Sequence, residues 1–142
     1  MKHCRHFLDY MATQPNAKLR YCASDMVLNV HSDASYLIAP NTQRRAAGYY
    51  FLGSVPKNLQ PIKLNGAIYV LCTVLKLVAS SAAEAELGAL FLNAKEAKIF
   101  RLTLEELGHK QPPTPIHAYN STTVGIVNNT IKRQKSRSME MI

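Results

Sequence analysis

Hydrophobic and polar positions change their period several times along the chain, and each change predicts a different element. Between residues 2 and 13, Phe7, Leu8 and Met11 recur at helical spacing, which predicts a short amphipathic helix. From Met26 onward the pattern is typical of strands. Three apolar or aromatic segments, at 26–33, 47–53 and 67–77, are separated by polar or proline-containing stretches, so we expect three strands there.

The strongest helical signal in the chain begins at Ser81. Ser81 and Glu84 stand three positions apart, which fits a capping box in which both side chains satisfy the first free backbone N–H groups. We expect the helix to run until Gly108, with a break near Asn93 as an open alternative. The apolar face predicted for its first half comprises Ala83, Leu87, Leu90, Phe91 and Ala94.

The last third of the chain predicts one more strand and one short helix. Three prolines between residues 112 and 115 favour extended backbone before a strand at 116–119, and a short helix is expected at 124–127. Strands joined by short turns pair antiparallel, whereas a strand reached through a helix adds in parallel. The sequence therefore predicts an α/β fold with a mixed sheet, in which strands 1–3 are antiparallel and helices pack on the sheet.

Composition and charge narrow the class of protein. The 142 residues include 17 Lys and Arg against 9 Asp and Glu, and a net charge of +8 favours an anionic partner such as nucleic acid. The longest apolar run, at 67–79, is too short to span a bilayer, and no signal peptide opens the sequence, so we expect an intracellular protein. Three cysteines without a C-x-x-C pair predict reduced, mostly buried thiols.

Two of the few acidic residues stand where chemistry can occur. Asp33 ends an apolar strand, a position that favours a turn-capping carboxylate, with a metal-binding carboxylate at the sheet terminus as the alternative. Glu84 already has a capping role. Glu86 has none, and its pattern alone favours a surface position at the edge of the apolar stripe.

Three segments taken together resemble a known family. They are residues 31–36 (HSDASY), 82–90 (AAEAELGAL) and 116–121 (IHAYNS). They resemble the ribonuclease H domain of copia-type (LTR) retrotransposon Pol polyproteins, with about fifty residues between Asp33 and Glu86 and about thirty more to the next strand. The resemblance covers residues 21–142 and implies a ribonuclease H-like fold, truncated here at its C-terminus with the last helix missing. Residues 1–20 resemble a remnant of the connection helix on the polymerase side of the same polyproteins.

The resemblance also implies a catalytic site. In that family four carboxylates hold two Mg²⁺ ions, which activate a water and stabilise the leaving oxygen when the RNA strand of an RNA/DNA hybrid is hydrolysed. It places Asp33 at the first carboxylate, Glu86 at the second and Glu140 at the fourth. At the third position Tyr119 replaces the family's Asp. A phenol with a pKa of about 10 is neutral at pH 7 and bulky, so we expect Tyr119 to obstruct the metal space and impair hydrolysis.

Basic residues provide candidate contacts for phosphates. Arg44 and Arg45, expected in a loop after the first strand, and a basic run before Glu140 favour nucleic-acid binding, with a solvated basic face as the alternative. The run comprises Lys132, Arg133, Lys135 and Arg137.

The resemblance further implies two partners, an RNA/DNA hybrid or other nucleic acid and the reverse transcriptase domain of the same polyprotein, in a cytoplasmic particle or the nucleus. Three functions stay open: a Mg²⁺-dependent hydrolase, a catalytically silent nucleic-acid-binding remnant, and an element fragment without function.

Overall fold

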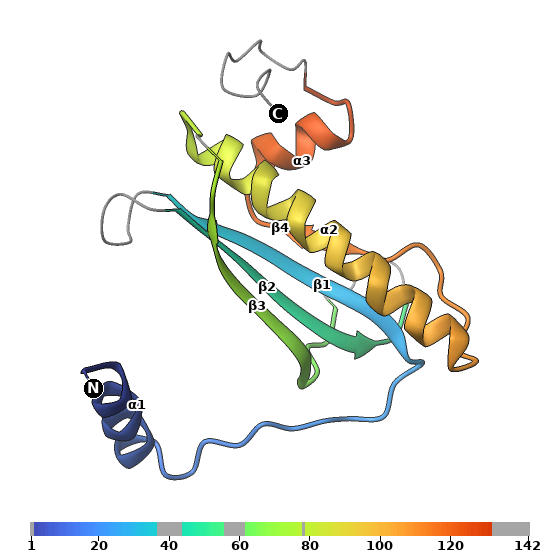
Figure 1. Cartoon of the computed structure of the whole chain (residues 1–142). Coiled ribbons are helices and arrows are strands. Elements are labelled where there is room, and N and C mark those ends of the chain that lie inside the picture. Colours follow the sequence, from blue (N-terminus) through green and yellow to red (C-terminus); the bar gives the residue numbers. More distant parts are fainter. Residues whose placement is uncertain (1, 37–43, 56–61, 78, 132–142) are drawn as a thin grey trace.

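The computed structural model describes residues 2–36, 44–55, 62–77 and 79–131 (Figure 1). Its elements are α1 (Lys2–Thr13), β1 (Val27–Ser35), β2 (Arg44–Gly53), β3 (Ala67–Leu75), α2 (Ala82–Glu106), β4 (Ile116–Ala118) and α3 (Ser121–Val127). The expected helices and strands are confirmed as elements. The expectation of a loop at Arg44 and Arg45 is wrong, because these residues open β2, where they pair with the ends of β1 and β3.

The four strands form one sheet in the order β3-β2-β1-β4. β1 pairs with β2, and β2 with β3, in antiparallel directions, whereas β4 runs parallel to β1. The parallel pair requires a crossover, and α2 provides it. The mixed α/β sheet predicted from the sequence is therefore confirmed, with β1 between an antiparallel and a parallel neighbour.

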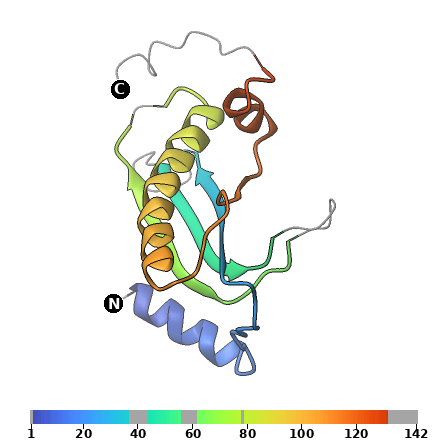
Figure 2. The same cartoon turned by 90° about the vertical axis from the view of Figure 1, so that its right-hand side faces the viewer.

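Helix α2 packs along one face of the sheet and contacts all four strands (Figures 1 and 2). The apolar face expected from the sequence is wrong at Phe91, which is 65% exposed, and at Ala94, which is also exposed, whereas its other members are half-buried. Small side chains face the sheet instead, including Ala85, Ala89 and Ala97. A Cβ added at Gly48 of β2 would lie 2.1 Å from Asn93 Oδ1 of α2, so the glycine leaves the space that this side chain occupies.

Asn93 explains why α2 continues without the break considered for this position. Its Oδ1 accepts a hydrogen bond from the hydroxyl of Tyr50 at 2.7 Å, and its Nδ2 donates to Ser32 Oγ at 2.8 Å and to the carbonyl of Ala47 at 2.9 Å. All the polar atoms of this buried amide are used, so the residue is stable in the middle of a helix. It joins α2 to β1 and β2 at the level of the sheet centre.

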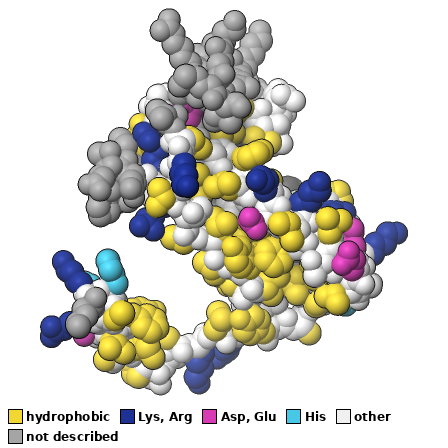
Figure 3. Space-filling model, in the orientation of Figure 1, with side chains coloured by type: hydrophobic (Ala, Val, Ile, Leu, Met, Phe, Trp, Pro, Cys, Tyr) yellow, Lys and Arg dark blue, Asp and Glu magenta, His cyan; other side chains and the backbone are white. Residues whose placement is uncertain are grey.

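The opposite face of the sheet carries no helix among the described residues, since α3 contacts α2 and β4, and α1 contacts no other element (Figure 2). Helix α1 has no buried residue, and its hydrophobic side chains gather on the side directed toward the rest of the molecule (Figure 3). No described helix has the length and apolar character needed to cross a membrane.

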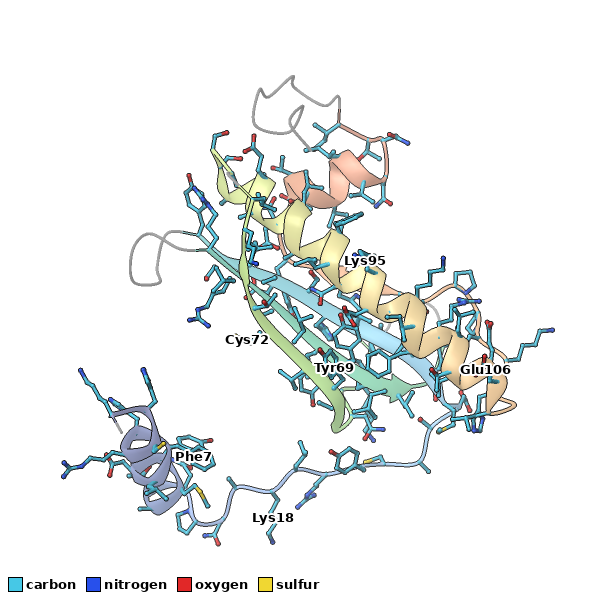
Figure 4. All side chains as sticks on the ribbon, viewed as in Figure 1. Phe7, Lys18, Tyr69, Cys72, Lys95 and Glu106 are labelled. Carbon is cyan, nitrogen blue, oxygen red and sulfur yellow. The ribbon has the colours of Figure 1, made fainter. Side chains whose placement is uncertain are left out.

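The cysteines lie outside the core, which corrects the expectation of mostly buried thiols. Cys4, Cys22 and Cys72 are all exposed. Cys4 belongs to the solvent-exposed α1, and Cys22 to the extended segment before β1. Cys72 lies on β3, one of the two edge strands of the sheet (Figure 4). Each sits in a part of the chain that no second layer covers.

Candidate active site

The carboxylates of Asp33 and Glu86 come together where β4 stops pairing with β1. The N–H of Val30 donates to Pro115 on the β4 side, and N–H groups two residues apart along a strand point to the same side. The N–H of Ala34 therefore points beyond the last paired residues of β4, where it favours the charged form of the Glu86 carboxylate and lowers its pKa. Glu86 of α2 and Asp33 of β1 are thus close enough for their charges to interact.

Glu86 is buried, at 8% exposure, whereas Asp33 is exposed. This corrects the surface position that the pattern alone favours for Glu86. Burial is the main cause that raises the pKa of Glu86, and the negative charge of Asp33 and a side-chain hydrogen bond with it raise this pKa further. The hydrogen bond from Ala34 acts in the opposite direction. Two carboxylates in one partly desolvated place resist simultaneous ionisation, and a cation between them would relieve the repulsion.

Glu84 has a separate role at the beginning of α2. Ser81 Oγ accepts a hydrogen bond from the N–H of Glu84 at 3.2 Å, as a capping box predicts. The reciprocal contact differs from the expected one, because the Glu84 carboxylate accepts from the N–H and hydroxyl of Ser80 rather than from Ser81. Glu84 thus stabilises the segment that precedes the helix, and Glu86 is the glutamate that reaches the end of β1.

Tyr119 follows directly after β4. The last parallel pair is Ser32 with Ala118, so Tyr119 stands beside Asp33 when the register is continued by one residue. Its ring stacks on His31, with 6.0 Å between ring centroids and 19° between planes, and its hydroxyl lies 3.2 Å from His31 Nδ1. The Tyr119 ring therefore lies over His31, on the face of the sheet that also carries Asp33, because alternate residues of a strand share one face.

A group of aromatic and imidazole side chains, missed by the sequence analysis, surrounds this tyrosine. The His31 ring lies 5.0 Å from that of His117 and stacks on Phe51 at 5.6 Å. Burial, followed by the charge of His117, lowers the pKa of His31, so its imidazole is favoured in the neutral form. The sequence contained one signal for this group. Side chains alternate between the two faces of a strand, so His31 lies on the same face as Asp33.

The two arginines of β2 have different environments. Arg44 is half-buried, donates from Nη2 to the carbonyl of Ala79 at 2.6 Å, and places its guanidinium 5.3 Å from the centroid of the Tyr36 ring. Through this contact Arg44 fixes the segment before α2. Arg45 is exposed and pairs with Ser35, which puts it on the same face as Asp33. The other predicted residues, Lys132, Arg133, Lys135, Arg137 and Glu140, lie outside the described residues.

In the described part of the chain, no three His, Cys, Asp or Glu side chains gather into a metal-binding group. The Asp33–Glu86 pair is therefore two carboxylates with a neutral tyrosine at the neighbouring strand position. Comparison with protein-family models, with curated proteins and with solved structures gave no match. Functional inference consequently rests on the chemistry of these side chains and on the resemblance of the three sequence segments.

Proposed function

We propose that this chain is a ribonuclease H-like domain of a copia-type retrotransposon Pol polyprotein, descended from a Mg²⁺-dependent nuclease and impaired at Tyr119. The observation that supports this most is the meeting of Asp33 and Glu86 at the end of β1, beside Tyr119. The three residues come from separate segments of the resemblance and from three elements of a mixed sheet. The corresponding partners are an RNA/DNA hybrid and the reverse transcriptase domain of the polyprotein, inside the cell.

The side chains that are present suit a divalent cation. Carboxylate oxygens are the ligands that Mg²⁺ prefers, and Glu86 Oε2 is buried without a hydrogen-bond partner. Asp33 and Glu86, together with Glu140 outside the described residues, would hold the metal ions, which would supply activation of water and stabilisation of the leaving oxygen. Tyr119 contributes no negative charge to the site at neutral pH. Asp33, Glu86 and the expected Glu140 bring three negative charges against the four positive charges of a metal pair, so we expect weak metal binding and little hydrolysis.

A gain-of-function experiment at Tyr119 tests this proposal. Tyr119→Asp adds a carboxylate next to Asp33 and removes the ring. We expect cleavage of the RNA strand of an RNA/DNA hybrid in Mg²⁺ to rise by two orders of magnitude or more, because metal-based charge stabilisation contributes several kcal/mol and each ~1.4 kcal/mol is tenfold in rate. Tyr119→Asn is the matched control, because it removes the same bulk without adding charge and should recover little activity.

Two further measurements make the result decisive. Asp33→Asn in the Tyr119→Asp background should abolish whatever cleavage appears, and Mg²⁺ binding measured by calorimetry should strengthen only in the Asp variant. If Tyr119→Asp folds, binds the hybrid and still does not cleave it, the proposal that Tyr119 is what impairs this site is rejected.

A silent nucleic-acid-binding remnant is the second candidate, and the net charge of +8 together with the neutral Tyr119 favours it. In that case the wild-type chain binds hybrid in the absence of Mg²⁺ and shows no cleavage.

A further inference from the structure

Three rings form a column across the sheet on the face opposite α2. Phe51 of β2 pairs with Asn29, which stands two residues before His31 on β1. Tyr119 stands two residues after His117, which is the partner of His31 on β4. The three side chains therefore follow one diagonal over three strands. The planes of Phe51 and His31 differ by 16°, and those of His31 and Tyr119 by 19°. We call Phe51, His31 and Tyr119 the ring column.

The ring column changes from buried to open along its length. Phe51 is fully buried, His31 is half-buried, and Tyr119 is 75% exposed. The outer ring nevertheless has a defined orientation, because it stacks on His31 and its hydroxyl lies within hydrogen-bond distance of His31 Nδ1. An exposed aromatic ring that is already oriented loses little side-chain entropy when a further flat ring stacks on it.

We propose that Tyr119 is the stacking site for an unpaired nucleobase of single-stranded nucleic acid, whose backbone continues toward Arg45. This inference rests on the nucleic-acid binding of the proposed function and adds the form of nucleic acid that the site takes. Successive bases of single strands stack on aromatic side chains while basic residues follow the phosphates. Arg45 provides the exposed cation on this face of the sheet.

The charge distribution favours a base rather than a phosphate above Tyr119. Asp33 stands beside Tyr119 in the continued strand register, and its carboxylate repels an anionic group placed there. A neutral base has no such penalty. In a paired duplex the flat faces of the bases are covered by their neighbours, so an exposed tyrosine ring meets only bases that are unpaired or at an end.

Fluorescence anisotropy with a labelled twelve-nucleotide DNA strand at low salt tests the inference on the full chain. Tyr119→Ala should weaken binding about tenfold, since one base–aromatic stack contributes roughly 1–3 kcal/mol. Tyr119→Phe keeps the ring and should weaken binding by less than about threefold, since it removes only the hydrogen bond with His31 Nδ1. Tyr10→Ala, which removes an exposed tyrosine from α1, should leave the affinity unchanged.

A ligand-side control makes the test independent of whether each variant folds. An oligonucleotide of equal length and charge in which all bases are absent should bind the wild-type chain about as weakly as Tyr119→Ala binds the normal strand. The inference is overturned if the wild-type chain binds the two oligonucleotides with equal affinity. It is also overturned if a folded Tyr119→Ala variant binds the normal strand as tightly as wild type does. The latter result is also expected if Tyr119 instead contacts another protein.

The outcomes separate this inference from the proposed function. Hybrid cleavage gained by Tyr119→Asp, with single-strand affinity unaffected by Tyr119→Ala, rejects the stacking site and keeps the proposed function. A wild-type chain that binds neither hybrid nor single strand rejects both.

Discussion

Glu86 has an electrostatic cost in the folded protein. Its carboxylate is buried, faces Asp33, and has one oxygen without a hydrogen-bond partner. Burial first, and Asp33 second, raise its pKa in the folded protein above the ordinary value. Because the folded state holds this proton more tightly than the unfolded state, stability falls as pH rises from the ordinary pKa through the raised one.

The variant Glu86→Gln should therefore be more stable than wild type at neutral pH in the absence of metal. Glutamine resembles the protonated acid, so the difference should vanish below about pH 4.5, the ordinary pKa of Glu86, and level off above the raised pKa. Urea unfolding from pH 4 to 8 in EDTA measures this. Glu106→Gln, at the exposed far end of α2 (Figure 4), is the matched control and should show no such growing difference. A wild type more stable than Glu86→Gln at pH 7 would contradict the prediction.

Strand β4 is short because proline limits its pairing with β1. Residues 112, 113 and 115 are prolines and have no N–H to donate, so the β1–β4 ladder covers only three residue pairs. Before the first residue of β1 that pairs with β4, the side chain of Gln111 makes the backbone hydrogen bonds that a longer β4 would make. Its Oε1 accepts from the N–H of Leu28 at 3.0 Å, and its Nε2 donates to the carbonyl of Met26 at 2.9 Å. One buried amide thus extends the pairing of β1 past the prolines.

Replacing Gln111 with Ala should destabilise this element. The variant removes both hydrogen bonds and leaves the buried N–H of Leu28 without a partner, which costs about 1–3 kcal/mol. Urea unfolding measures the decrease in stability, and amide hydrogen exchange should show reduced protection at Leu28. The same truncation at Gln14, an exposed glutamine after α1, serves as the control. Unchanged protection at Leu28 would show that water or another group replaces the amide.

The whole molecule has a net charge of +8, which affects every encounter with nucleic acid. We expect hybrid affinity to fall steeply between about 50 and 200 mM salt, because bound phosphates release counterions. Neutralising Lys132, Arg133, Lys135 and Arg137 together should reduce the slope of log affinity against log salt. The reduction should be roughly 0.7–0.9 for each phosphate that the chain no longer neutralises. Anisotropy titrations at several salt concentrations measure it.

A second quadruple variant provides the control for total charge. Neutralising Lys2, Arg5, Lys18 and Arg20, which are exposed in the N-terminal segment, changes the net charge by the same amount. The prediction requires a larger change of slope for the run near the C-terminus. Equal slopes in the two variants would show that net charge alone, and no localised contact, determines binding.

The order, type and approximate bounds of the elements could be predicted from the amino-acid sequence. The helical period of α1, the Ser81 cap of α2 and the prolines before β4 act between residues close in the chain, so each is visible locally. The mixed sheet followed because hairpins give antiparallel pairs and a helical crossover gives a parallel one. The residues of the candidate site were predicted from the family resemblance, and their catalytic roles remain predictions.

Which side chains are buried and which meet became clear from the packed fold alone. The buried place of Asn93 in α2 depends on Gly48 of β2, and the raised pKa of Glu86 depends on burial and on Asp33 of β1. The orientation of Tyr119 depends on His31, which is 88 residues away in the chain. Such outcomes are set by distances between elements that are remote in sequence, and hydrophobic period and residue spacing carry no information about those distances.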